Sequence, residues 1–112
     1  MRLPNIDQAT VLETKITEYL LSETHPDGRE KAAFFTRYGF SVAEWEAMVR
    51  ALLQHAADHE VVRATTTPHG TKYIIEGELS TPDGRNPEVR TVWIIEEGDT
   101  AAHLITAYPV KG

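Results

Sequence analysis

The chain has 112 residues, a formal net charge of −6 at pH 7 and no cysteine. This length favours a single domain over residues 1–112, and the missing cysteines exclude disulfides, thiolate zinc sites and thiol nucleophiles. The acidic balance argues against broad electrostatic binding of nucleic acid. It leaves room for a small basic cleft, and it also suits a basic protein partner.

The N-terminal residues lack the apolar segment of a signal peptide, and no run approaches 18 apolar residues. We therefore expect a soluble cytoplasmic chain without membrane contact, or the tip of a larger secreted protein.

The first half of the chain has helical periodicity. Residues 11–22 and 29–38 each carry apolar side chains at helical spacing, which predicts two short helices separated by a turn at 24–28. Gly39 suits a left-handed C-terminal cap of the second helix. We expect these side chains to face the core: Leu12, Ile16, Tyr19 and Leu20 in the first helix and Ala32, Ala33 and Phe35 in the second, with Arg29, Glu30 and Arg37 outward.

A third helix begins after a capping box, in which Ser41 caps the helix and Glu44 reaches back. It is expected to run to about residue 58, because apolar residues repeat there at i, i+3 and i+4. The side chains predicted to be largely buried between helix and sheet are Trp45, Leu52, Ile75 and Trp93.

After residue 59 the apolar pattern changes to a period of two, which is typical of strands. Short links with turn residues favour hairpins, and the sequence PDGR, present at 26–29 and at 82–85, is interpreted as two turns. The predicted class is α+β, with three N-terminal helices followed by a four-stranded antiparallel β-meander and the helices packed on one face. The four predicted strands are 59–67, 71–80, 89–96 and 101–108.

Four histidines have plain structural interpretations. His55 and His59 share a helical face at a spacing that can hold zinc, but Ala56 stands where the zinc-protease motif needs Glu. A solvated face is therefore favoured there, and no metal is expected. His69 lies at a predicted hairpin tip, and His103 lies on a half-buried strand.

The stretch HPDGREK, residues 25–31, places His25 and Lys31 where a loop becomes a helix. A solvated turn explains these residues equally simply. The functional interpretation is that both lie near the positive end of a helix, which attracts phosphate.

A second polar group lies on the last two strands. If these strands pair through the short turn between them, Arg90 lies near Ala107 and Thr91 near Thr106. Arg90, Thr91, Thr106 and Tyr108 then gather at one end of the sheet. Cross-strand pairs of this kind also stabilise sheets without any catalytic role.

The motifs YLLSETHPDGREKAAFF, GTKYIIEGELSTPDGRNPEVRTVWII and LITAYP resemble a toxin-associated bacterial domain family of unknown function. Its members are small free-standing proteins or the ends of large secreted proteins, and the resemblance covers residues 3–109. The layout in turn resembles the barnase–EndoU–colicin–RelE-like ribonucleases, many of which end on a strand like residues 106–109, TAYP.

This resemblance implies a metal-independent, toxin-like endoribonuclease without a cofactor. For the active site it implies only types of residue: a His or Lys from the helical half, and Arg, Thr or Tyr from the sheet. RNA is cleaved by attack of the 2′-hydroxyl on the adjacent phosphate. The predicted general acid or base is His25; Lys31 and Arg90 would bind the scissile phosphate, and Thr106 and Tyr108 would position it. Expected partners are an RNA substrate and a small antitoxin or immunity protein.

The alternative left open is a non-enzymatic, immunity-like or adaptor-like module whose acidic surface binds a basic partner. In that case the five predicted site residues need not converge.

Overall fold

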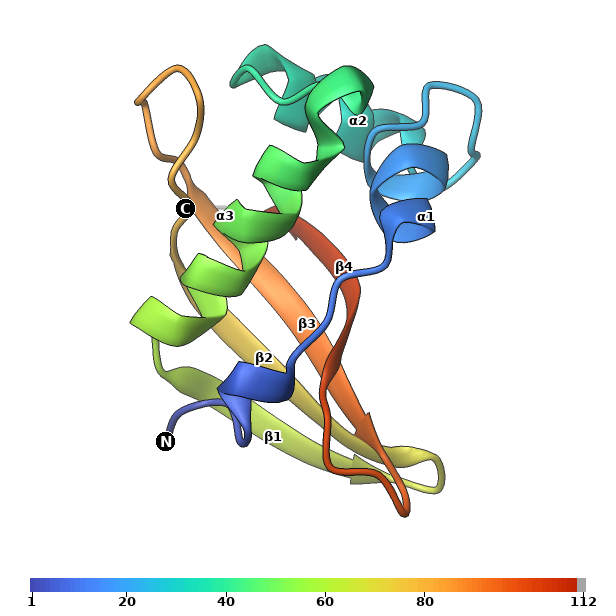
Figure 1. Ribbon diagram of the computed structural model, residues 1–112, viewed down its shortest axis with the longest axis vertical. Helices are drawn as coiled ribbons and strands as arrows, with labels where there is room; N and C mark the ends of the chain where they lie inside the picture. Colours follow the sequence, from blue (N-terminus) through green and yellow to red (C-terminus); the bar gives the residue numbers. More distant parts are fainter. Residues whose placement is uncertain (111–112) are drawn as a thin grey trace.

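The computed structural model describes residues 1–110, and in them a helical first half precedes a sheet (Figure 1). The predicted α+β class, with helices first and strands second, is confirmed. In chain order the elements are the 3₁₀ turn η1 (Ile6–Gln8), α1 (Glu13–Lys15), the π-helical turn η2 (Ile16–Leu20), α2 (Arg29–Arg37), the 3₁₀ turn η3 (Val42–Glu44), α3 (Trp45–Asp58), β1 (Val61–Thr67), β2 (Gly70–Glu78), β3 (Glu88–Glu96) and β4 (His103–Pro109).

Within the described residues the sheet has four antiparallel strands in the order β1-β2-β3-β4. This is the predicted meander, since each strand pairs with its neighbour in sequence. The observed strand bounds lie within two residues of the predicted ones.

A β-bulge interrupts the pairing of β3 with β4. Val92 faces Thr106, whereas the next residue, Trp93, faces Leu104. Ile105 is therefore the extra residue, and strict alternation of faces ends at this point of β4.

The bulge corrects the predicted register at the far end of these strands. Arg90 faces Tyr108 rather than Ala107, and Thr91 faces Ala107 rather than Thr106. The prediction assumed an unbroken hairpin, and one inserted residue shifts every later pair by one. Arg90 and Tyr108 thereby become direct cross-strand neighbours on one face of the sheet.

The first helix is shorter than predicted for 11–22. It consists of one turn of α1 followed by η2, where the amide of Leu21 donates to the carbonyl of Ile16 at 2.8 Å. This i+5 bond widens the turn, as is typical of π-helical segments. Leu12, expected to face the core, precedes α1 and is 61% exposed.

The two later helices keep their predicted ends within one residue or so. Ser41 Oγ accepts from the Glu44 amide at 3.3 Å, as the capping box requires, and α3 ends at Asp58. Gly39, beyond α2, has the predicted positive φ of 103°. Ala33 was predicted to face the core but is exposed, and the buried residues of this helix are Ala32 and Phe35.

The core forms mainly between α3, η2 and the sheet. Leu52, Ile75 and Trp93 are completely buried, as predicted. Trp45 begins α3 and packs against the core, but it is less completely buried than the other three, as is usual for a large amphipathic ring. The other fully buried large side chains are Phe35, Ile16, Leu20, Met48, Leu79, Leu104, His55, Val89 and Thr91.

The helices are arranged in two groups (Figure 1). The long helix α3 extends along the sheet and contacts β2, while α1 and α2 contact β4. This second group brings the start of α2 close to the end of β4, where the predicted site residues lie.

Candidate functional site

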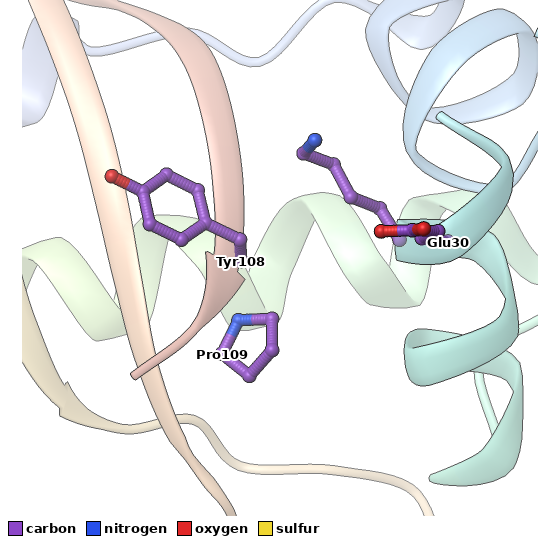
Figure 2. Close-up of a pocket in the computed structure, with 4 residues that line it drawn as sticks. Glu30, Tyr108 and Pro109 are labelled. Carbon is purple, nitrogen blue, oxygen red and sulfur yellow. The ribbon is translucent and has the colours of Figure 1, made fainter. Parts of the chain in front are cut away.

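A cleft of about 490 Å³ lies between α2 and the end of β4 (Figure 2). Glu30 and Lys31 of α2 line one side, and Tyr108 and Pro109 of β4 line the other. Two predicted site residues, Lys31 and Tyr108, thus share one cleft. Glu30 was predicted to face outward from its helix and was not proposed as a site residue. Its helical position does not show which other element lies beside it.

Arg90 lies beside the cleft, against Tyr108. Its guanidinium carbon is 5.5 Å from the centroid of the Tyr108 ring, a cation–π arrangement. Arg90 Nε donates to Glu76 Oε2 at 2.6 Å, and a second guanidinium nitrogen pairs with the same oxygen. The Tyr108 side chain, and then the hydrogen bond and charge of Glu76, raise the pKa of Arg90 above its ordinary value. The guanidinium therefore stays charged. It has five N–H donors, and some of them do not bind Glu76.

Tyr19 of η2 connects the helical half with the sheet, whereas its helical spacing predicted only a core role. Its hydroxyl lies 3.0 Å from Thr106 Oγ1 on β4. Its ring meets the His25 ring edge-on at 5.0 Å. The ammonium groups of Lys15 and Lys31 lie 5.1 and 5.5 Å from the ring centroid. The sequence did contain one indication of this contact, because Tyr19 lies among apolar residues at helical spacing. A buried tyrosine usually directs its hydroxyl to a hydrogen-bond partner.

His25 contacts the backbone at the start of α2. Its Nδ1 accepts hydrogen bonds from the amides of Asp27 and Gly28 at 3.0 and 3.1 Å. Its own carbonyl accepts from the amides of Gly28 and Arg29. Because Nδ1 is an acceptor here, the proton of the neutral ring is on Nε2.

The five predicted residues therefore form one chain of contacts rather than one shared lining. Lys31 and Tyr108 line the cleft, and Arg90 stacks on Tyr108. Thr106 and His25 contact Tyr19 instead, and are not among the residues that line the cleft. Whether any of these residues takes part in catalysis stays a prediction.

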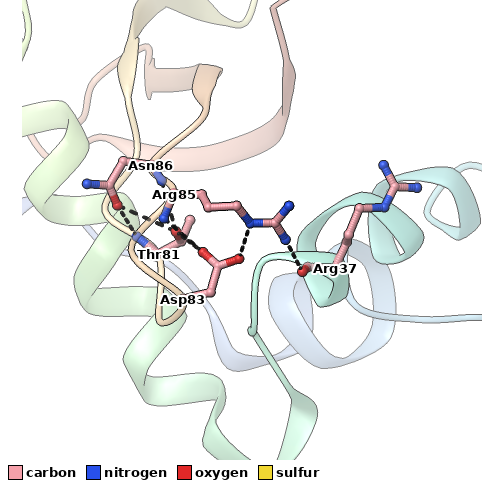
Figure 3. Close-up of polar contacts among 5 residues, drawn as sticks. All are labelled: Arg37, Thr81, Asp83, Arg85 and Asn86. Atoms are coloured by element: carbon pink, nitrogen blue, oxygen red, sulfur yellow. Dashed lines mark hydrogen bonds and ion pairs between the residues drawn. The ribbon is translucent and has the colours of Figure 1, made fainter.

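The loop between β2 and β3 fixes the other end of α2 (Figure 3). Arg85 donates to the Arg37 carbonyl at 2.7 Å and lies over the Tyr38 ring. The amide of Asp83 donates to the Tyr38 carbonyl at 3.2 Å. Burial raises the pKa of Asp83, but the hydrogen bonds from Arg85 and Thr81 outweigh it and lower the pKa. The second PDGR turn thus satisfies carbonyls at the end of α2.

His55 is buried, which corrects the predicted solvated face. Nε2 donates to the carbonyls of Val89 and Gly77 at 2.9 and 3.1 Å. Trp93 Nε1 donates to Thr91 Oγ1 at 2.9 Å, and this hydroxyl in turn donates to His55 Nδ1 at 3.1 Å. Burial lowers the pKa of His55, and the two carbonyls oppose that effect only in part. Both ring nitrogens are therefore occupied within the protein.

The remaining histidines also have local partners or exposed positions. His59 Nε2 donates to the Glu78 carbonyl at 2.9 Å, and His103 Nε2 lies 3.0 Å from Glu96 Oε1. His69 lies in the turn between β1 and β2 and is exposed, as predicted. Among residues 1–110 no three histidines or carboxylates are grouped to hold a metal ion. No helix in this part of the chain is long and apolar enough to cross a membrane.

Comparisons with known proteins give one family and one informative structure. A search of curated proteins finds no significant match. A solved structure described as "Contact-dependent growth inhibition toxin - immunity protein complex from Klebsiella pneumoniae 342" contains a chain with a similar fold, at a TM-score of 0.73 and 19% identity. The similarity covers 96% of this chain and 97% of that one. At this identity it shows the fold alone, and the resemblance to the ribonuclease superfamily stays a prediction. The family model described as "Domain of unknown function (DUF6883)" matches residues 2–111, so the chain belongs to that family.

Proposed function

We propose that this chain is a toxin-like domain that cleaves RNA without a metal ion, using the cleft between α2 and β4. The observation that carries the proposal is that Glu30, Lys31 and Tyr108 line one cleft of about 490 Å³. A carboxylate and an ammonium group supply a base and a cation from α2, and Tyr108 supplies an O–H donor from the opposite side, with its hydroxyl directed away from α2 (Figure 2).

The proposed reaction is attack of the ribose 2′-hydroxyl on the neighbouring phosphorus. Glu30 takes the proton of the 2′-hydroxyl as its oxygen forms the new bond to phosphorus. The bond from phosphorus to the 5′-oxygen breaks, and that oxygen takes a proton from the Tyr108 hydroxyl. The products are a 2′,3′-cyclic phosphate and a free 5′-hydroxyl, and proton exchange with water restores both side chains.

Lys31 and Arg90 stabilise the charge that develops on the phosphate oxygens. Lys31 lies in the cleft lining, and Arg90 keeps donors that Glu76 does not engage. The stack of Arg90 on Tyr108 holds the phenol beside this cation. Thr106 supports the site through its contact with Tyr19.

The proposed biological setting is a toxin domain at the tip of a larger protein, held inactive by a small immunity protein. The similar fold in a toxin–immunity complex supports this setting. A net charge of −6 restricts RNA contact to the cleft rather than to a broad basic surface.

RNA cleavage by the purified chain in EDTA tests the proposal. We expect wild type to release 2′,3′-cyclic phosphate ends, and Glu30→Gln and Lys31→Ala each to lower the rate about 100-fold or more. Glu46→Gln and Lys72→Ala change exposed residues away from the cleft and serve as matched controls. Failure of wild type to cleave total RNA or a transfer RNA pool would overturn the proposal.

One observation favours the alternative of a binding module. A second, acidic concavity of about 520 Å³ includes Asp58, Glu76, Glu78 and Glu88 in its lining. Such a surface suits a basic protein partner. Under this alternative no RNA is cleaved, and Glu78→Lys or Glu88→Lys weakens a complex whose stability falls as the salt concentration rises.

A further inference from the structure

We infer that His25 is a positioning residue: its Nδ1 caps the turn that leads into α2 and thereby holds Glu30 and Lys31 at the cleft. It does not transfer a proton in the reaction. The catalytic part of this inference rests on the proposed function, whereas the capping part does not.

The backbone around His25 has the geometry of a helix start. Its carbonyl accepts from the amides of Gly28 and Arg29 at 3.1 and 3.0 Å, which are the first bonds of a helical turn. Pro26 then occupies the first helical position, where a missing amide proton costs nothing. His25 is thus the cap residue of a turn that leads to α2, whose own first backbone bond runs from the Ala32 amide to the Gly28 carbonyl at 2.7 Å.

The side chain of His25 accepts from two amides of this turn, of which that of Gly28 is shared with the His25 carbonyl and that of Asp27 is not. Nδ1 accepts from Asp27 and Gly28, the second and third residues after the cap, as the oxygen of a capping Asn or Asp does. Nδ1 of His and Oδ1 of Asn are separated from Cβ by the same number of bonds. Asn at position 25 can therefore make the same two hydrogen bonds, and Ala cannot.

The same contacts oppose a role for His25 in proton transfer. With Nδ1 accepting two amides, the neutral ring carries its proton on Nε2 and has no free lone pair to act as a base. A doubly protonated ring would bring an N–H against the amides of Asp27 and Gly28, so acting as the acid would break the cap. His25 is also not among the residues that line the cleft.

Other contacts connect this turn to the residues of the cleft. The Lys31 ammonium donates to the Asp27 carbonyl at 3.1 Å, directly within the capped turn. Gly28 approaches Tyr19 so closely that a Cβ on it would lie 2.0 Å from the Tyr19 carbonyl oxygen. Glu30 and Lys31 follow this turn, so a loosened cap moves the base and the cation together.

The experiment compares His25→Asn with His25→Ala, and uses His69→Asn and His69→Ala on the exposed β1–β2 turn as controls. The first readout is amide hydrogen exchange in the folded proteins. We expect the amide of Asp27, which has no acceptor but Nδ1, to exchange about tenfold faster in His25→Ala and within about threefold of wild type in His25→Asn, a cap being worth roughly 1 kcal/mol. Equal loss of protection in both variants would overturn the cap.

The second readout is RNA cleavage. A cap predicts that His25→Asn keeps the wild-type rate within about threefold while His25→Ala loses more. A proton-transferring histidine predicts that both variants lose about 100-fold or more, and that outcome would overturn the positioning role. Wild type without any cleavage would overturn the proposed function, and the exchange readout would then decide the capping role by itself.

The third readout is the protonation of the ring in wild type. Long-range proton–nitrogen NMR spectra should show the neutral ring of His25 with its proton on Nε2. A proton on Nδ1 would contradict the inference, because that nitrogen could not accept from the amides of Asp27 and Gly28.

Discussion

The hydroxyls of Tyr19 and Thr106 lie 3.0 Å apart although 87 positions separate them in the chain. This hydrogen bond joins η2 to β4, so it connects the helical group that carries His25 and Lys31 with the strand that carries Tyr108.

Removing this bond should weaken the protein modestly. Tyr19→Phe and Thr106→Val should each lower the free energy of unfolding by about 1 kcal/mol. The double variant should lose less than the two single losses combined, because both remove the same bond. Urea denaturation of the three variants measures this, and strictly additive losses would show that the hydroxyls do not interact.

Gly28→Ala should destabilise the protein by about 1–3 kcal/mol or more. The added Cβ would meet the backbone of Tyr19, 2.0 Å from its oxygen and 2.9 Å from its carbonyl carbon, and backbone cannot move aside as a flexible side chain does. Asp27→Ala, in the same turn but exposed, should change stability by only about 0.5 kcal/mol. Similar denaturation midpoints for Gly28→Ala and wild type would contradict this close approach.

Leu52→Ala should lower the free energy of unfolding by about 2–5 kcal/mol, since Leu52 is fully buried in the core and leaves a cavity. Leu12→Ala is the matched control: the same atoms are removed from a side chain that is 61% exposed, so we expect about 0.5 kcal/mol or less. Chemical unfolding measures both, and equal losses would show that Leu52 is not a core residue.

Stability should fall as the pH drops below about 6.5. Burial lowers the pKa of His55 in the folded protein below its ordinary value of 6.5. In the window between these two values the unfolded chain binds a proton that the folded protein does not, so acid favours unfolding. The stabilisation is complete above 6.5, and one proton changes it by at most about 1.4 kcal/mol per pH unit.

Two measurements check this prediction. Urea denaturation midpoints should decrease from pH 7.5 toward pH 5.5. NMR titration of the wild-type imidazole signals should show that His55 takes up its proton below its ordinary pKa of 6.5. Titration of His55 at its ordinary value would contradict it, because the bonded network of Thr91, Val89 and Gly77 would then not hold a neutral ring.

Much of the fold follows from local patterns. The capping box at Ser41, the αL glycine at Gly39 and the change of period near residue 59 predicted the ends of elements, because caps and periodicity depend on neighbouring residues. The short links predicted the meander for the same reason. The first helix was predicted too long, since packing rather than propensity ends it in a π-helical turn.

The candidate site was only partly readable in this way. The sequence proposed Lys31, Arg90 and Tyr108, which the fold brings together at one end of the sheet. It did not propose Glu30, which lines the cleft, or Tyr19, which contacts Thr106 and His25, because these positions depend on which element lies opposite. No local sequence pattern predicts that the start of α2 lies beside the end of β4.

What the sequence determined alone is the set of chemical groups and the elements that carry them. The register of the strands and the partners of these groups depend on the tertiary structure. The bulge at Ile105 sets Arg90 opposite Tyr108, and Glu76 forms an ion pair with that arginine. The cap formed by His25 uses the nitrogen that a general base would need. Contacts of this kind join residues that are distant in sequence or depend on one inserted residue, so neither periodicity nor spacing contains them.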